Sequence, residues 1–168
     1  MTIAKIAPYG SWKSPITSDL IVAQTTMLSD VRLDNGRVYW LEGRPQEHGR
    51  SVVVGARADG TVADITPAGF NARTRVHEYG GASWLMDDGI CIFSNFADQR
   101  LYRQRPGVAE PEPLTPVPES RKHHWRYSDG VIDARRRRWI GVREDHVSPG
   151  EAVAVVAVDL DHPVRIGR

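Results

Sequence analysis

The stretch "DNGRVYWLEG", residues 34–43, decides the fold of this chain. Its first three residues form a typical hairpin turn, because Asn and Gly tolerate the positive φ angles of tight turns. The turn leads straight into Val38-Tyr39-Trp40, a β-branched and aromatic run of the kind found in strands. The same order returns 53 positions later, where Asp88-Gly89 leads into "ICIF" at 90–93. The chain is therefore built from repeated hairpin units.

Each unit continues in the same way. A polar loop and a second strand follow, and the unit closes on Thr-Pro, at Thr66-Pro67 and again at Thr115-Pro116, 49 positions apart. A third unit begins near Tyr127, and there the charged corner Arg135-Arg136 replaces the glycine turn. Runs rich in β-branched and aromatic residues and bounded by turn residues predict strands at 36–43, 50–60, 89–95, 99–104, 138–144 and 152–160.

Units of about 50 residues with four short strands each are typical of β-propeller blades. Helix signals are weak, since 15 Gly and 11 Pro interrupt most helical patterns. We therefore expect an all-β fold, an incomplete β-propeller of about three four-stranded antiparallel blades. The expected parts are a lead-in at 1–29, a partial propeller at 30–161 with blades at about 30–67, 82–116 and 126–160, and a divergent tail at 162–168. Propellers usually have roughly 4–8 blades, so three cannot close a ring.

Composition limits the location and the partners of the chain. A formal net charge of +1 gives no long-range attraction to nucleic acid or to an anionic membrane. A single cysteine, Cys91, excludes an internal disulfide framework and suits a reducing compartment. The N-terminal residues lack the apolar core of a signal peptide, and no run reaches the roughly 18 apolar residues that span a bilayer. We expect a cytoplasmic protein with no nucleic-acid or membrane partner.

Several polar groups are expected to be structural, and no metal or cofactor is expected. His77-Glu78 lacks the second histidine of H-E-x-x-H, and the adjacent His123 and His124 would point to opposite faces of a strand. The arginines at 135–138 are expected to splay over a solvated hairpin corner, and 95–98 to form a tight connection between strands. Large aromatic residues are expected to pack between blades: Trp40, Trp84, Trp125 and Trp139.

Six stretches, in order, carry a resemblance to a known family; among them are "TRVHEYGGASW" at 74–84 and "RYSDGVIDARRRRWIGVREDH" at 126–146. The six lie at 7–21, 38–50, 74–84, 93–104, 126–146 and 150–161. The chain resembles the start of a bacterial peptidase of the prolyl oligopeptidase family of serine peptidases, in its acylaminoacyl-peptidase or dipeptidyl-aminopeptidase-like branch. The match extends through about Asp161, and only the tail leaves the pattern.

The resemblance implies a two-domain enzyme. An N-terminal propeller, typically seven-bladed, caps a C-terminal α/β-hydrolase domain that carries Ser, Asp and His on a fold with a G-x-S-x-G elbow. This chain has no such elbow, since "YGSWK" at 9–13 and "GASWL" at 81–85 lack the closing glycine. We therefore expect no catalytic residue here and no activity of the chain alone. It would be an expressed fragment, one half of a split protein or, as we favour, a truncated gene product.

The segment "RTRVHEYGG" at 73–81 is the densest group of reactive side chains. The resemblance places it on the propeller face that meets the hydrolase domain, where the carboxylate of Glu78 would hold the free amino group of a peptide substrate. The expected substrate-binding residues are Arg75, His77, Glu78 and Tyr79. Alternatively, Glu78 pairs with Arg73 or Arg75 and only orders the crossing between blades.

A second charged group, "REDH", lies at 143–146. Arg143 and Glu144 would contact the peptidase domain at the propeller rim, and an ordinary salt-bridged loop is the alternative. Ser83 with His77 is the serine–histidine pair close enough in sequence to test as nucleophile and base. Two functions fit these patterns: a propeller that caps and gates a peptidase, or a stand-alone module that binds a protein partner and oligomerises through its open blade edges.

Overall fold

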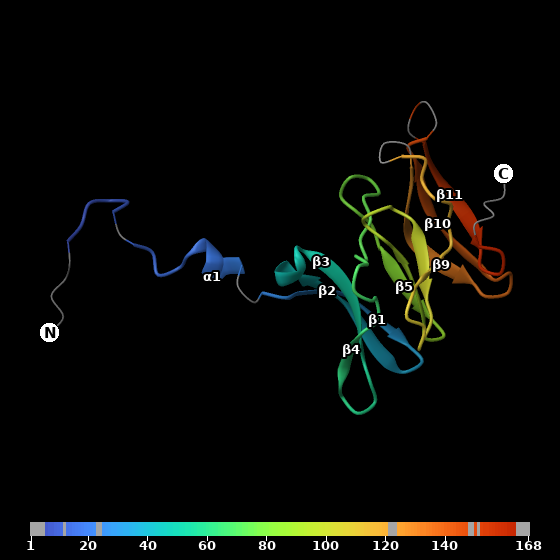
Figure 1. The fold of residues 1–168 in the computed structure, drawn as a ribbon, viewed down its shortest axis with the longest axis horizontal. Coiled ribbons are helices and arrows are strands. Elements are labelled where there is room, and N and C mark those ends of the chain that lie inside the picture. Colours follow the sequence, from blue (N-terminus) through green and yellow to red (C-terminus); the bar gives the residue numbers. More distant parts are fainter. Residues whose placement is uncertain are drawn as a thin grey trace.

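The computed structural model describes residues 6–11, 13–22, 25–120, 124–147, 150 and 152–163, and antiparallel strands are its main secondary structure (Figure 1). A lead-in segment with one short helix, α1 (Ser18–Val22), extends away from the strands. In the described part of the chain, no helix is both long enough and apolar enough to cross a bilayer. The expected tail lies outside the described residues beyond position 163.

The strands form three consecutive antiparallel sheets. The first sheet, in the order β1-β2-β3-β4, consists of β1 (Met27–Asp34), β2 (Arg37–Arg44), β3 (Arg50–Ala56) and β4 (Val62–Asp64), with a 3-10 turn, η1 (Pro45–Glu47), after β2. The second, in the order β5-β6-β7-β8, consists of β5 (Trp84–Asp87), β6 (Ile90–Ser94), β7 (Leu101–Gln104) and β8 (Glu112–Pro113). The third, in the order β11-β10-β9, consists of β9 (Trp125–Asp133), β10 (Arg138–Asp145) and β11 (Ala152–Asp159).

These sheets confirm the predicted fold class, a partial β-propeller. All six predicted strand runs contain a strand, and the third sheet has three strands among the residues that the structure describes. The sheets meet through their first strands, since β1 contacts β5 and β5 contacts β9. Strand β1 begins at Met27, slightly before the expected start of the first blade.

The repeated turns of the sequence lie side by side in space. The carboxylate of Asp34 accepts hydrogen bonds from the backbone N–H of Asp88 at 3.1 Å and of Gly89 at 2.7 Å. The side-chain amide of Asn35 in turn donates to the carboxylate of Asp88 at 3.0 Å. The first turn therefore holds its counterpart in the next sheet, which makes the sequence repeat a structural repeat.

The core fills the two spaces between the three sheets. Tyr39 and Val53 of the first sheet pack with Trp84 and Phe93 of the second in one buried cluster. A second cluster joins the second and third sheets, and its buried members are Leu85, Ile92, Leu101, Leu114, Tyr127, Trp139 and Val158. Of the four tryptophans expected between blades, Trp84 and Trp139 are buried in these clusters as predicted, and Trp125 packs against the second cluster while partly buried.

The polar connections also match their predictions. The β9–β10 turn contains Arg135 and Arg136 and is exposed, and Arg136 pairs with Asp133 at 3.1 Å. In the β6–β7 connection, the Asn95 side chain donates to the carboxylate of Asp98 at 3.0 Å. The same carboxylate accepts the backbone N–H of Arg100 at 3.3 Å, which closes the turn.

Candidate functional site

The segment 73–76 crosses from the first sheet to the second with alternating burial. Arg73 and Arg75 are exposed, whereas Thr74 and Val76 are buried. This alternation is that of a strand with one solvent-facing side, although the segment is not a strand. Its wet side therefore carries two guanidinium groups, and its dry side anchors it to the core.

The next residues form a turn with an uncommon backbone. His77 and Glu78 both have positive φ angles, 55° and 59°, and Gly80 follows at 86°. Residues other than glycine rarely adopt this region, and it persists only where neighbours impose it. Here the N–H of Glu78 donates to the Arg75 carbonyl at 2.9 Å, and the N–H of His77 donates to the Glu144 carboxylate at 3.1 Å. The turn is thus fixed from both sides.

Glu78 leaves this turn toward a cation of the third sheet. Its Oε1 accepts a hydrogen bond from Nη1 of Arg126, in β9, at 2.6 Å. The Glu78 side chain is 71% exposed, whereas that of Arg126 is 10% exposed. The hydrogen bond and charge of Arg126 lower the pKa of Glu78, so Glu78 is an anion at neutral pH. Glu78 does not pair with Arg73 or Arg75, because its ion-pair partner, Arg126, comes from the third sheet.

Glu144, in β10, lies beneath this ion pair. Its side chain is buried and accepts hydrogen bonds from Arg126 at 3.2 Å and from the His77 backbone at 3.1 Å, and it contacts the His146 ring at 2.9 Å. Burial opposes the charged form, but His146, the His77 N–H and the charge of Arg126 together lower the pKa of Glu144. A buried carboxylate therefore balances the buried guanidinium.

Two histidine rings complete the group. Nε of Arg126 donates to Nε2 of His124 at 3.1 Å, and the rings of His124 and His146 stack with centroids 5.3 Å apart. We call this group the Arg126 cluster, which consists of Glu78, His124, Arg126, Glu144 and His146. It joins the turn at 76–79 to the end of the third sheet where β9 begins and β10 ends.

The sequence predicted only part of this cluster. Glu78 and Glu144 were singled out in separate segments, but Arg126, which joins them, was not, because 48 positions separate it from Glu78. His124 is buried just before β9, which contradicts the expectation of a solvent-exposed loop histidine, and His123 lies outside the described residues. The signal that could have found Arg126 is its place at the head of the third unit, directly before Tyr127.

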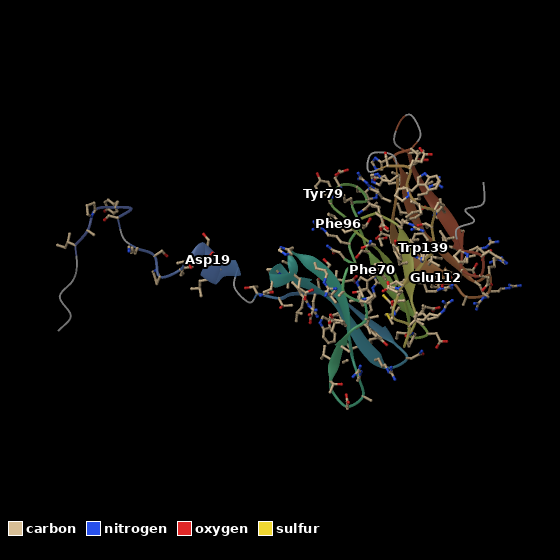
Figure 2. The ribbon with its side chains drawn as sticks, viewed as in Figure 1. Asp19, Phe70, Tyr79, Phe96, Glu112 and Trp139 are labelled. Atoms are coloured by element: carbon tan, nitrogen blue, oxygen red, sulfur yellow. The ribbon has the colours of Figure 1, made fainter. Side chains whose placement is uncertain are left out.

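Other expected site residues take different positions. Tyr79 is 97% exposed and lies at the outer edge of the molecule (Figure 2). The guanidinium of Arg143 lies over the Trp125 ring, 5.0 Å from its centroid. Ser83 donates its hydroxyl to the Ala72 carbonyl at 2.9 Å. Because His77 faces Glu144, Ser83 and His77 do not form the hydrogen bond that a nucleophile and its base require.

Arg73 and Arg75 share one aromatic neighbour. Their guanidinium carbons lie 4.9 Å and 4.4 Å from the centroid of the Phe96 ring, in the β6–β7 connection. Both guanidinium groups are exposed, and in the part of the chain that the structure describes no carboxylate pairs with either. The site therefore presents an anchored anion, Glu78, and two stacked cations within one segment.

Comparison with solved structures finds close likenesses. A puromycin-hydrolysing peptidase of Mycobacterium tuberculosis is 38% identical with a TM-score of 0.80, and the match covers 92% of this chain and 25% of that one. A puromycin hydrolase is 35% identical with a TM-score of 0.77, over 94% of this chain and 25% of that one. A mutant of puromycin hydrolase complexed with PGG matches equally well, at 35% identity and a TM-score of 0.77, over 92% and 25%.

No family model and no curated protein matches the chain. The chain spans about a quarter of the length of the peptidases that it matches. Their likeness confirms the peptidase resemblance that the sequence stretches carry.

Proposed function

We propose, on the premise that this chain corresponds to the N-terminal propeller part of prolyl oligopeptidase-family peptidases, that it caps a peptidase active site. In this proposal it limits the access of substrates and contributes contacts to them, and an α/β-hydrolase domain outside these 168 residues performs hydrolysis. Two observations support the division of labour. The sequence holds no G-x-S-x-G elbow, and Ser83 and His77 bond to other groups.

The observation that carries the substrate role is the state of Glu78. One carboxylate oxygen, Oε1, is held by Arg126 at 2.6 Å, and the side chain is mostly exposed. Oε2 can therefore accept from a ligand without breaking the ion pair. An ammonium group removed from water requires such an anion, and a charge-assisted hydrogen bond to it is short and strong. Glu78 would hold the free amino group of a peptide, with Arg75, His77 and Tyr79 around it.

Recognition of an ammonium group also separates the two candidate branches of the family. A peptide with a free amino end offers the cation that Glu78 would bind, whereas an acylated end offers none. The anionic Glu78 therefore favours an aminopeptidase-like specificity over an acylaminoacyl one.

The proposal gives Arg143 and Glu144 different roles. The guanidinium of Arg143 lies over the Trp125 ring, and 21% of the Arg143 side chain is exposed. Arg143 would contact the hydrolase domain. Glu144 is buried in the Arg126 cluster, so it would act through Arg126 by fixing the orientation of Glu78.

A chimera tests the substrate role. The chain would replace the matching quarter of the M. tuberculosis puromycin-hydrolysing peptidase, and kcat/KM would be measured on aminoacyl p-nitroanilides with free and acetylated amino ends. We expect Glu78→Gln to lower kcat/KM on the free-amine substrate at least about tenfold, the size of one charged hydrogen bond, and to leave the acetylated substrate unchanged. The matched control, Glu110→Gln, removes an exposed carboxylate of the β7–β8 connection and is expected to change neither.

The chain alone tests the division of labour. We expect no turnover of either p-nitroanilide by the purified 168-residue chain. Turnover that a serine-directed phosphonate abolishes would contradict the proposal. In the chimera, an equal loss of kcat/KM on both substrates in Glu78→Gln would show that Glu78 has only a structural role.

One observation favours the alternative, a stand-alone module that oligomerises and binds a protein partner. Strand β1 exposes a row of large apolar side chains, and so does the edge strand β11: Met27, Leu28, Val31, Leu33, Val153 and Val155. Exposed apolar strands invite pairing with another sheet. Light scattering after size-exclusion chromatography separates the two functions, because a discrete dimer supports the module and a monomer or mixed aggregate supports the peptidase part.

A further inference from the structure

Arg73 and Arg75 form a rigid pair of cations. Both guanidinium groups lie within 5 Å of the centroid of one ring, that of Phe96, where cation–π attraction holds them. Their backbones are fixed as well, since the N–H of Arg73 donates to the Ser94 carbonyl at 3.0 Å and the N–H of Arg75 donates to the side chain of Gln99 at 2.9 Å. Little freedom is left to lose when these two groups bind a ligand.

The pair has no anionic partner of its own. Within the described ranges, every ion pair uses other residues, although both arginines are exposed. Among the described residues that line the neighbouring pocket, the carboxylate is that of Asp98, and it already accepts hydrogen bonds. It accepts from the Tyr102 hydroxyl at 2.6 Å, from the Asn95 amide at 3.0 Å and from a backbone N–H. The positive charge of the pair is therefore available to a ligand.

A pocket of about 520 Å³ opens beside Arg75, which lines it together with Phe96, the ring that Arg73 also contacts. Its size is that of small-molecule sites, which combine aromatic walls with a few polar groups. It is lined by Arg75, Phe96, Ala97, Asp98, Gln99, Pro118, Ser120 and His124. A small ligand therefore fits this position better than the flat surface of another domain.

We infer that Arg73 and Arg75, stacked on Phe96, form a binding site for the carboxylate of a small ligand. The planar fork of a guanidinium matches the two oxygens of a carboxylate, and here two such forks lie within 5 Å of the centroid of one ring. If the proposed function holds, on which this identification of the ligand rests, the ligand is a short peptide. Its carboxylate would bind at the arginine pair, and Glu78 is the separate site for an amino group.

Four forms of triglycine separate the two sites: the free peptide, its N-acetyl form, its amide, and the form blocked at both ends. Each would be titrated into the 168-residue chain, with the backbone N–H signals of Arg73, Arg75 and Phe96 followed by NMR. We expect the two forms with a free carboxylate to shift these signals and the two amides to leave them in place. Failure of both carboxylate forms to bind would overturn the inference, whatever the amides do.

Variants locate the binding. Arg73→Gln and Arg75→Gln are each expected to weaken binding of the acetylated peptide at least about tenfold. The control Arg135→Gln removes the same charge at the exposed β9–β10 turn and should leave affinity unchanged. An equal loss of affinity in the control would overturn the inference, because binding would then depend only on the net charge of the chain. The comparison of peptides uses the unaltered chain, so it decides the matter even if a variant fails to fold.

The design keeps two failures apart. Glu78→Gln should leave binding of the acetylated carboxylate peptide unchanged, because that peptide has no ammonium group. If this peptide shifts the signals of Arg73, Arg75 and Phe96, but the free-amine amide leaves the backbone N–H signal of Glu78 in place, the carboxylate site stands and the amino-binding role of Glu78 falls. If the free-amine amide binds and the acetylated carboxylate peptide does not, the arginine site is wrong and the amino-binding role of Glu78 stands.

Discussion

Glu78 and Arg126 lie 48 positions apart in the chain, and a contact of 2.6 Å between their side chains joins the crossing turn to the third sheet. The contact is asymmetric, because Arg126 is buried and Glu78 is exposed. The buried partner keeps its orientation through Glu144 and His124, and the exposed partner faces solvent in a defined place. An inter-sheet ion pair thus fixes the carboxylate that we propose as the ligand contact.

The first prediction concerns Arg126. Replacing it by Gln leaves the buried Glu144 without its guanidinium, and breaking such a pair typically costs about 3 kcal/mol or more. We expect Arg126→Gln to lower the free energy of unfolding by about 3 kcal/mol in urea denaturation. The control Arg136→Gln breaks an exposed pair with Asp133 and should shift the urea midpoint far less than Arg126→Gln does. Equal effects of the two variants would show that the cluster is not coupled to stability.

The second prediction concerns pH. The pKa of Glu144 lies below its ordinary value of 4.5 in the folded chain, although burial opposes this, because His146, the His77 N–H and Arg126 favour the anion. A carboxylate with a lowered folded pKa stabilises the fold above its unfolded pKa, and this contribution disappears as the pH falls through the folded pKa. We expect the stability difference between the unaltered chain and Glu144→Gln to be full at pH 7 and to shrink below about pH 4.5. Urea midpoints measured from neutral to acidic pH check this; a constant difference would contradict it.

The fold could be predicted from sequence because its signals are local. Three residues are enough to predict a turn such as Asp34-Asn35-Gly36. Its recurrence at Asp88-Gly89 reveals the length of the repeat. The contact between those two turns, by contrast, follows only from the packing of one sheet on the next.

The candidate site was harder to predict from the sequence, because its contacts depend on the packing of one sheet on the next. Glu78 and Glu144 were found as charged residues in dense segments, yet the group that unites them, Arg126, comes from a third segment. Local charge density predicts that a residue has a partner but not which one, because the register between sheets decides it. Closeness in sequence favoured the pairing of Glu78 with Arg73 or Arg75. In the structure both arginines instead stack on the Phe96 ring.

The third prediction uses the space that Trp139 needs. A Cβ at Gly130 would overlap the indole ring of Trp139, which is 2% exposed in the core between the second and third sheets. We expect Gly130→Ala to destabilise the chain by about 2–3 kcal/mol, because the ring must leave its place. The control Gly43→Ala puts a Cβ in ordinary contact with the side chain of Met27, 3.5 Å away, and should cost less than about 1 kcal/mol. Thermal and urea unfolding would measure both.

The last prediction tests whether the repeat is energetic as well as geometric. Thr66 and Thr115 close equivalent units and are both buried. The hydroxyl oxygen of Thr66 accepts the N–H of Val53 at 3.0 Å, and that of Thr115 accepts the N–H of Leu101 at 3.1 Å. Each hydroxyl therefore satisfies a backbone donor in the third strand of its sheet.

Thr→Val keeps the shape of the side chain and removes the acceptor, which leaves a buried N–H unsatisfied at a cost of about 1–3 kcal/mol. Since the two threonines occupy the same place in their units, we expect Thr66→Val and Thr115→Val to cost equal amounts within about 0.5 kcal/mol, and the double variant to cost their sum. Urea denaturation of the three variants measures this. If one substitution were neutral and the other costly, the two units would share a backbone pattern without sharing the interaction that closes it.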